Sequence, residues 1–396
     1  MTTTINNEHK KLNVPNKREQ NQTCLDSAER EGLSPKGNVP NLRFPEFQGE
    51  WEKCKLGDII NFSTTRVNSS ELNKDNYVST ENMLQDYQGI VKAKSVPEDV
   101  NVVSFSCDDI LISNIRPYLK KVWKATFNGG CSSDVFVLKA NDNIESDYLH
   151  YVIANDKFIN FVMSGAKGVK MPRGDKKQME TYSLSLPQIQ EQHKIARLLS
   201  LLDERISTQN KIIDKLQSLI KGIAQKIVHS NKTNVRLSEC VECSSSTLQE
   251  SDVCEHGAYP VYGANGIVGY LDNYNTEGEA VYIIKDGSGV GTVSYVKGKC
   301  SATGTLNTLQ AKEGYSLQYL YYLLKVFNFE PYKTGMAIPH IYFKDYGKAK
   351  VFCPSYTEQL QYARLLSAID NKLSIEQNIL TELSLQKQCL LRQMFI

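Results

Sequence analysis

Two clusters of basic residues are the best candidates for chemistry in this chain, and the chemistry that they suit is the binding of phosphates. Residues 116–124, RPYLKKVWK, contain no acidic residue, and residues 165–177 contain Asp175 as their one acidic residue. Lysine and arginine in loops hold phosphates, whereas Arg, Asn or Gln that reach base edges discriminate between sequences. The candidates are Arg116, Lys120, Lys121, Lys124, Lys167, Lys170, Arg173, Lys176 and Lys177. A basic surface that is merely solvated is the alternative interpretation.

A second, less basic group of candidates follows residue 260. Its members are Tyr262, Asn265, Lys285, Ser288, His340 and Lys344. The glycines of GSGVG, residues 287–291, lack the lysine that completes a phosphate-binding G-x-x-x-x-G-K-[ST] loop. A tight turn between strands is therefore favoured over a nucleotide site.

Four residues have the types, but not the spacing, of a zinc site. They are Cys240, Cys243, Cys254 and His256. Their spacing matches no zinc finger and no second C-x-x-C closes the set, so ordinary thiols are favoured and a metal is the weaker alternative.

Catalytic motifs are missing from the sequence. Neither an S-adenosylmethionine loop nor the Asn/Asp-Pro-Pro-aromatic element of adenine methyltransferases occurs, and there is no H-E-x-x-H. We therefore expect no catalytic residues, no metal and no cofactor, and predict a recognition protein rather than an enzyme.

The overall charge and the N-terminus restrict the class of protein. A net charge of +2 with 23% charged residues excludes a polycation, so any DNA contact must come from local clusters. The start of the chain has no basic segment followed by an apolar run, and no later apolar stretch is about 18 residues long. We expect a soluble, cytoplasmic protein without a membrane partner, whose ten cysteines are reduced.

The elements that must position the candidates are duplicated. Residues 187–207, PQIQEQHKIARLLSLLDERIS, and 354–374, PSYTEQLQYARLLSAIDNKLS, are identical at 10 of 21 positions without a gap. The offset is 167 residues, which indicates one architectural unit used twice. Strand-like runs such as 109–113, 134–138, 281–284 and 292–296 precede the copies, with expected helices at 148–163 and 319–327.

Each copy begins a long helix with the heptad pattern of a coiled coil. Steps of 4 and 3 alternate along the first seam, Ile195, Leu199, Leu202, Ile206, Gln209, Ile213, Leu216, Ile220, Ile223 and Ile227. Adding 167 gives Tyr362, Leu366, Ile369, Leu373, Glu376, Leu380, Leu383, Lys387, Leu390 and Met394. Gln209 and Glu376 are matching polar positions, either kept to fix register or a product of drift. Because of Lys387, we expect looser packing at the far end of the second helix.

The pattern predicts an α+β fold with two duplicated, mixed, strand-rich globular domains joined by two long helices that form an antiparallel intramolecular coiled coil. Ser355 and Glu358 have capping-box spacing at the second helix start. Leu198, Leu365, Ile212 and Ile379 widen the apolar stripe beyond the seam, so they pack under the domains or against a partner protein. The expected parts are a flexible tail 1–38, domains 39–186 and 233–353, and spacer helices 187–232 and 354–396.

Several segments resemble the specificity subunit of type I restriction-modification systems. They are NVPNLRFPEFQGEWEKCKLGDI, both copies of the duplicated helix start, and the SGAKGVKM and TGMAIPHI loops, and the resemblance covers residue 39 to the end. It implies two target recognition domains that each read half of a bipartite double-stranded DNA site. It also implies spacer helices that dock methyltransferase subunits, expected to be two, with restriction/translocase subunits joining through the complex.

Two other functions remain open at this point. The first is a coiled-coil scaffold or adhesion protein with two ligand-binding heads, because fold analogy cannot exclude it. The second is a nuclease with unrecognised carboxylates. A seam of 33 residues, Ile195 to Ile227, corresponds to about 50 Å of helix, and one DNA turn is about 34–36 Å, so the helices suit a spacer between half-sites.

Overall fold

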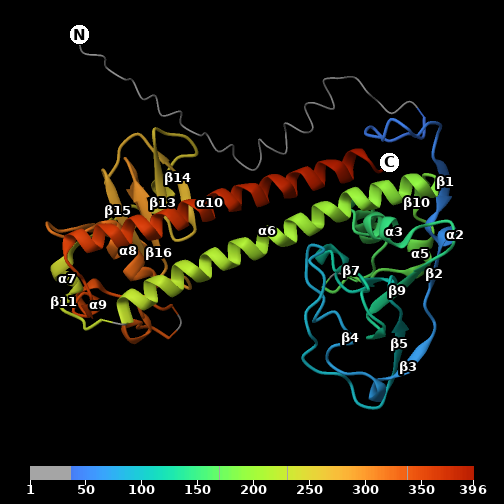
Figure 1. Cartoon of the computed structure of the whole chain (residues 1–396), viewed down its shortest axis with the longest axis horizontal. Coiled ribbons are helices and arrows are strands. Elements are labelled where there is room, and N and C mark those ends of the chain that lie inside the picture. The colour runs from blue at the N-terminus through green and yellow to red at the C-terminus, as the bar shows by residue number, and fades with distance from the viewer. Residues whose placement is uncertain (1–36, 169, 230, 337) are drawn as a thin grey trace, which may run out of the picture. The chain divides into compact units, whose positions relative to one another are not determined.

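The computed structural model describes residues 37–168, 170–229, 231–336 and 338–396 (Figure 1). Of the expected tail, residues 1–36 lie outside the described residues. The chain divides into two compact units, Met1–Ser207 with Thr381–Ile396, and Thr208–Leu380. Each of the two long helices therefore contributes one part to each unit.

The first unit consists of short strands and short helices ahead of a long helix. Its elements are β1 (Glu52–Lys55), α2 (Leu56–Ile59), β2 (Ile60–Phe62), β3 (Arg66–Asn68), η1 (Ser69–Glu71), β4 (Tyr77–Val78), β5 (Asn101–Phe105), β6 (Ile110–Ser113), η2 (Pro117–Leu119), β7 (Val122–Lys124), β8 (Gly129–Cys131), β9 (Val135–Ala140), α3 (Ser146–Ile153), α4 (Asp156–Ser164), α5 (Lys176–Glu180), β10 (Ser183–Leu186) and the start of α6 (Ile189–His229).

Two four-stranded sheets organise this unit. One has the antiparallel order β2-β9-β6-β7, and the other has the order β3-β5-β8-β4 with β4 parallel to β8. Successive side chains of a strand point to opposite faces. In β6, accordingly, Ile110 and Ile112 join the core that also holds α3, while Leu111 joins a second core on the other face.

The second unit repeats this plan. Its elements are β11 (Val235–Arg236), α7 (Leu237–Cys240), β12 (Val241–Ser245), η3 (Glu250–Asp252), β13 (Tyr259–Gly263), β14 (Gly266–Leu271), β15 (Glu279–Ile284), β16 (Val293–Lys297), β17 (Ser301–Ala302), β18 (Leu306–Ala311), α8 (Leu317–Lys325), η4 (Glu330–Tyr332), α9 (Phe343–Tyr346), β19 (Lys350–Val351) and the start of α10 (Tyr356–Gln393).

The sheet order of the second unit, β12-β18-β15-β16, matches that of the first strand for strand. The parallel pair β4–β8 also has a counterpart in β13–β17. In β15, Val281 and Ile283 face the core beneath α8, and Tyr282 faces the opposite core. The predicted fold class is thus confirmed: the fold is α+β with two duplicated strand-rich domains.

One expected helix is broken in two. The single helix predicted over 148–163 is wrong, because α3 ends at Ile153 and α4 begins at Asp156. The Asn155 side chain accepts a 2.9 Å hydrogen bond from the Lys157 backbone amide and so caps the second helix. Asn competes with helical hydrogen bonding in this way, which favours a new helix start over continuation.

A buried glutamine fastens each domain to its long helix. Gln192 Oε1 accepts from the Glu145 amide at the start of α3 (2.9 Å), and its Nε2 donates to the Pro187 carbonyl (2.9 Å). Gln359, 167 residues later, accepts from the Ser316 amide at the start of α8 (2.8 Å) and donates to the Pro354 carbonyl (2.9 Å). Both side chains satisfy backbone groups that burial would otherwise leave unpaired.

A tyrosine–aspartate hydrogen bond makes a second repeated fastening. Tyr151 Oη donates to Asp203 Oδ2 (2.9 Å) in the first unit. Tyr322 Oη donates to Asp370 Oδ2 (3.4 Å) in the second. Each bond joins the short helix of a domain to the long helix that follows the domain in sequence.

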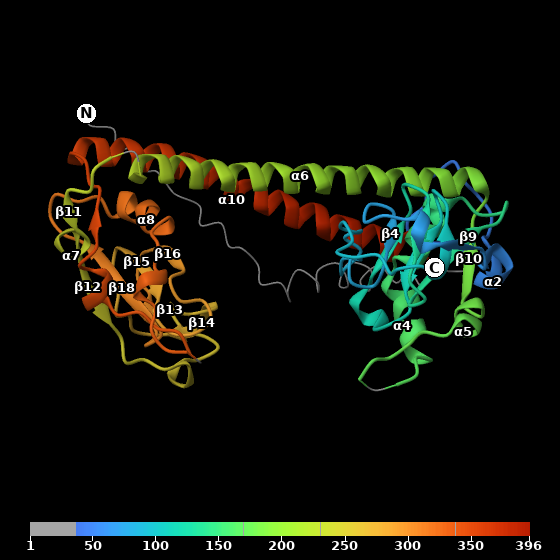
Figure 2. The same ribbon diagram turned by 90° about the horizontal axis from the view of Figure 1, so that it is seen from below.

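The two long helices pair antiparallel, with matching polar residues against each other. In the second unit the later part of α6 lies beside the earlier part of α10 (Figure 2), and Ile213, Ile220, Leu366 and Leu373 are buried there. Gln209 Nε2 donates to the Glu376 carbonyl (3.0 Å) and to its carboxylate. Gln209 and Glu376 are equivalent positions in the two repeats, so the matching polar residues of the two seams contact each other within the second unit.

The far end of α10 is well packed, so the expectation of looser packing there is wrong. In the first unit Lys387 Nζ binds Asp203 Oδ1 (2.6 Å) and lies over the Tyr151 ring. Met394 and Phe395 are buried against the start of α6 and α3. The charge of Lys387 is therefore paired rather than disruptive.

The predicted cap at the start of α10 is confirmed, and the four extra apolar positions differ in their exposure. Ser355 and Glu358 form the predicted capping box, with the Ser355 amide donating to Glu358 Oε2 (3.1 Å). Leu198 packs on the first core, whereas Leu365, Ile212 and Ile379 are 51%, 37% and 37% exposed. Within the described ranges, no helix combines the length and apolarity needed to cross a membrane.

Candidate nucleic-acid interface

A hairpin loop brings two of the predicted basic segments of the first unit together. The backbones of Lys167 and Arg173 exchange hydrogen bonds of 3.1 and 2.9 Å, which close the loop. The Arg116 amide donates to the Pro172 carbonyl (2.8 Å), and the Gly174 amide donates to the Asn114 carbonyl (2.8 Å). The loop is thereby fixed beside the end of β6, next to Arg116.

The second unit holds an equivalent loop by equivalent hydrogen bonds. Thr334 and His340 exchange backbone bonds of 2.9 and 2.8 Å. The Gly287 amide donates to the Pro339 carbonyl (3.0 Å), and the Ile341 amide donates to the Lys285 carbonyl (2.9 Å). The loop positions differ by 167 from those in the first unit, so His340 corresponds to Arg173, and it forms a β-bridge with Asp286 as Arg173 does with Ile115.

Both loops require glycine at the same place. Gly168 and Gly335 have φ values of +95° and +89°, a region that other residues rarely adopt. A Cβ on Gly335 would also lie 2.3 Å from the Ile338 carbonyl oxygen. The two repeats therefore share the backbone conformation at this glycine.

The tips differ in chemistry, a point that sequence reasoning missed. The first tip carries Lys170 and Met171, both exposed. The second carries Met336 and Ile338, whose side chains are 106% and 66% exposed. The sequence did contain a signal for the apolar tip. Apolar residues stand there between a glycine and a proline, in a segment too short to form one face of a core.

Several predicted basic residues of the first unit already have partners within their own unit. Lys120 Nζ pairs with Asp156 (2.8 Å), and Lys124 Nζ pairs with Asp108 (3.0 Å) and with Asp147. Such residues are less available to a phosphate than the exposed lysines are.

The remaining lysines differ in what their side chains contact. Lys176 Nζ lies over the Phe62 and Phe136 rings, 5.0 and 4.9 Å from their centroids. Lys121 Nζ donates to the Thr80 carbonyl (2.5 Å), and burial, followed by Arg116, lowers its pKa. Lys167, Lys170 and Lys177 are exposed, with Lys167 3.8 Å from Asp175.

The candidates of the second unit lie at two neighbouring places. Tyr262 is in β13, where burial raises its pKa, and Asn265 is exposed in the turn to β14. Ser288 is exposed beside Gly287. The Tyr342 ring contacts both remaining candidates: its centroid lies 5.0 Å from that of the His340 ring and 5.1 Å from Lys344 Nζ. The Lys285 amide binds the Thr305 carbonyl (3.0 Å).

The cysteines suggested as metal ligands are not gathered into a site. Cys240 Sγ lies 3.7 Å from Cys353 Sγ, and Cys254 is exposed. The described residues contain no group of three or more His, Cys, Asp or Glu side chains that could hold a metal.

The duplicated fold and paired loops agree with comparison to known proteins. Residues 48–218 and 229–385 match the family model described as the type I restriction modification DNA specificity domain. The chain belongs to this family. The family is defined by a DNA specificity domain, which confirms the resemblance read from the sequence and the prediction of a specificity protein.

Relatives in this family carry matching names. A type I restriction enzyme specificity subunit (MjaVIII) of Methanocaldococcus jannaschii is 29% identical over 54% of this chain and 54% of its own length. A putative type I specificity subunit of Mycoplasma genitalium is 23% identical over 87% of this chain and 96% of its own length. The chain aligns with about a third to a half of the first relatives, including 28% of the Escherichia coli EcoDI specificity subunit.

Solved structures of type I systems share the fold. The S subunit of a type I system from M. genitalium superposes with a TM-score of 0.65 at 18% identity, covering 90% of this chain and 99% of that chain. A chain from a structural study of type I complex assembly and conformational transition has a TM-score of 0.51 at 17% identity, covering 87% and 97%. At such identities the likeness concerns the fold alone.

Proposed function

We propose that this chain is the sequence-reading subunit of a type I restriction-modification complex, and that each repeat reads one half of a split double-stranded DNA target. The observation that carries the proposal is the pair of equivalent loops, 167–174 and 334–341, fixed by the same backbone hydrogen bonds in two different units. Exposed loops on a rigid scaffold are the usual carriers of recognition. Residues 39–186 and 233–353 are the proposed reading domains.

The long helices are the proposed spacer and docking surface. Ile212 and Ile379 are equivalent positions outside the seam, and both are 37% exposed. A duplicated exposed apolar position suits two copies of one partner, and here the proposed partners are two methyltransferase subunits. Restriction/translocase subunits would join through the complex, in the cytoplasm and without a membrane.

Binding to duplex DNA at several salt concentrations tests the proposal against a scaffold. We expect affinity that falls steeply with ionic strength, because phosphate contacts release counterions, together with preference for one split motif. A coiled-coil scaffold or adhesion protein would show neither property. Cleavage of DNA by the purified chain with magnesium alone would favour the nuclease alternative instead.

Domain exchange tests the division of labour between the repeats. Replacing residues 39–186 with the corresponding domain of another family member should change one half of the methylated motif in the host and leave the other half intact. A change in both halves would refute the proposal.

Insertion of residues into both helices tests the spacer role. The distance between the half-sites should change while the bases within each half-site stay the same. If the bases change instead, the helices do not act as a spacer.

A further inference from the structure

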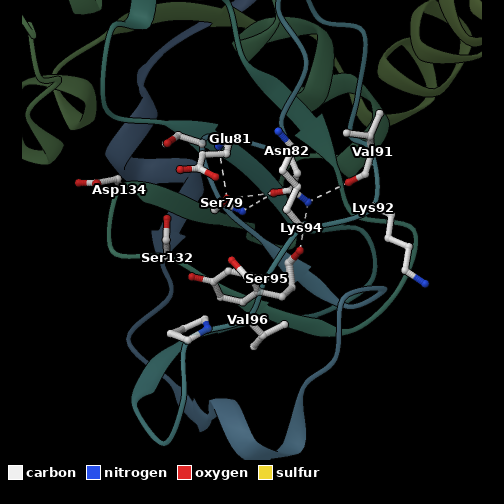
Figure 3. A pocket seen from close by; sticks show the side chains of 13 residues that line it. Ser79, Glu81, Asn82, Val91, Lys92, Lys94, Ser95, Val96, Ser132 and Asp134 are labelled. Carbon is white, nitrogen blue, oxygen red and sulfur yellow. Dashed lines mark hydrogen bonds between the residues drawn. The ribbon is translucent and has the colours of Figure 1, made fainter.

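The first unit contains a cleft of about 360 Å³ that none of the predicted DNA-contacting residues lines (Figure 3). Its walls come from the segment after β4, from residues 91–97 and from the segment after β8. Polar and charged side chains are prominent among them, including Ser79, Glu81, Asn82, Lys94, Ser132 and Asp134. Its size is near the lower limit of ordinary ligand sites.

Asn82 fixes the shape of this cleft. Its side chain is 4% exposed and makes hydrogen bonds with both amide atoms. Oδ1 accepts from the Ser79 amide (2.6 Å) and hydroxyl (3.2 Å), while Nδ2 donates to the Tyr77 (3.1 Å) and Val91 (2.9 Å) carbonyls. These bonds use the donors and acceptors of the amide. Asn82 therefore ties two walls together and is not available to a ligand.

Other groups in the cleft are available. Among the described residues, no ion pair or side-chain hydrogen bond holds the Glu81 carboxylate or the Lys94 ammonium. The Ser132 hydroxyl is buried and has no hydrogen-bond partner there.

The cleft is continuous with the basic loops. Asp134 lines it, and Asp134 Oδ1 accepts a 3.0 Å hydrogen bond from Arg173 Nη1 in the 167–174 loop. The Thr80 carbonyl, on the adjacent wall, accepts from Lys121 Nζ. A duplex held by these loops would place its surface against the cleft.

Glu81 needs a partner of a particular chemistry on such a surface. A carboxylate is repelled by phosphates, and in the major groove the only donors that bases offer are the amino groups of cytosine and adenine. Resting on the proposed function, we infer that this cleft reads one base pair of the first half-site. Glu81 accepts from the amino group of a cytosine or adenine, and Lys94 holds the neighbouring phosphate.

The test compares Glu81→Gln with Glu71→Gln in the full chain assembled with its methyltransferase subunits. Glu71 is exposed in η1 of the same unit and does not line the cleft, so its substitution removes the same charge elsewhere. Binding sites would be selected from duplexes randomised at both half-sites. For Glu81→Gln we expect a loss of preference of about tenfold at one base pair of one half-site, with the other half-site unchanged.

Two outcomes overturn the inference. Equal gains in affinity for all duplexes in both variants, with every preference unchanged, would mean that Glu81 acts only as a surface charge. Altered preference in both half-sites would mean that the cleft does not read one base pair. If the unsubstituted complex selects no split motif, the proposed function itself fails, and that result is separate from any effect of the variants.

Discussion

The two repeats hold their long helices by the same glutamine contacts but differ at the glutamate that precedes each glutamine. Gln192 and Gln359 make the same bonds to a helix start and to a proline carbonyl. In contrast, the equivalent positions Glu191 and Glu358 have unrelated surroundings. The two repeats have therefore kept the hydrogen bonds that the glutamines make to backbone groups. The adjacent glutamate position has different contacts in each repeat.

The largest expected difference between the repeats concerns Glu191 and Glu358. Glu191 is fully buried, where it pairs with Arg43 through two 2.8 Å bonds and accepts from Trp51 Nε1 (3.2 Å). Glu191→Ala leaves a largely buried arginine without its partner, so we expect a loss of about 3–5 kcal/mol in the free energy of unfolding. Glu358→Ala removes only an exposed capping contact, and should cost about 1 kcal/mol.

Urea unfolding of both variants measures this difference. Equal losses would mean that the salt bridge in the first repeat adds no more than a helix cap. The comparison between Glu191 and Glu358 would then have to be abandoned.

Acid should destabilise the first repeat through His150, which has Tyr321 as its counterpart. Burial, followed by Lys387, lowers the pKa of His150 from its ordinary value to about 4. As the pH falls from about 6.5 to about 4, the unfolded chain binds a proton at this site while the folded chain does not. Stability therefore falls by up to about 3 kcal/mol in this window.

The control is His150→Phe, which keeps a ring of similar size and removes the titration. The difference between the free energies of unfolding at pH 7 and at pH 4.5 should be smaller in the variant than in the parent. An unchanged pH dependence would show that His150 titrates normally.

The two glutamines should be equally important, in contrast to the glutamates. Gln192 and Gln359 are 1% and 2% exposed. Replacing either with Ala leaves a buried backbone amide and carbonyl without partners, and should cost about 2 kcal/mol. Thermal or urea unfolding of the two variants gives the comparison. A loss of stability confined to one repeat would show that the same hydrogen bonds contribute different free energies to the two repeats.

The features predicted correctly from the sequence are those that recur periodically along the chain. The heptad steps and the 10 matched positions of the duplicated segment indicate paired helices, and the strands at 110–113 and 281–284 follow from β-branched runs between turn residues. Gln192, Asp203 and their copies lay inside the matched segment, but identity alone did not show what they bind. Their partners lie about 50 residues earlier in the chain.

The missed features depend on contacts between distant segments. Arg43 and Glu191 are 148 residues apart, and nothing local to either residue indicates the pair. The cleft of the first unit joins three segments between residues 77 and 134, and a search for basic clusters passes over its acids. The break at Asn155 was the exception, since an Asn followed by an acidic residue is a local helix-start signal.

The smallest expected effect concerns the two tyrosine–aspartate bonds, where the repeats share an arrangement but differ in distance. Tyr151 Oη is 2.9 Å from Asp203, whereas Tyr322 Oη is 3.4 Å from Asp370. Tyr→Phe removes one hydrogen bond and little volume. A bond to a charged group contributes about 1.5–3 kcal/mol when short, so we expect Tyr151→Phe to cost about 1.5 kcal/mol and Tyr322→Phe about 0.5 kcal/mol.

Asp203 gives this last comparison its control. Asp203 also binds Lys387 at 2.6 Å, so the aspartate keeps a partner when Tyr151 loses its hydroxyl. Measured with Lys387→Met in a double-mutant cycle, the cost of Tyr151→Phe should change by at least about 0.5 kcal/mol, because the two partners share one carboxylate. Additive costs would show that the hydroxyl and the ammonium act on Asp203 independently, so that one bond joins α6 to α3 and a separate bond joins α6 to α10.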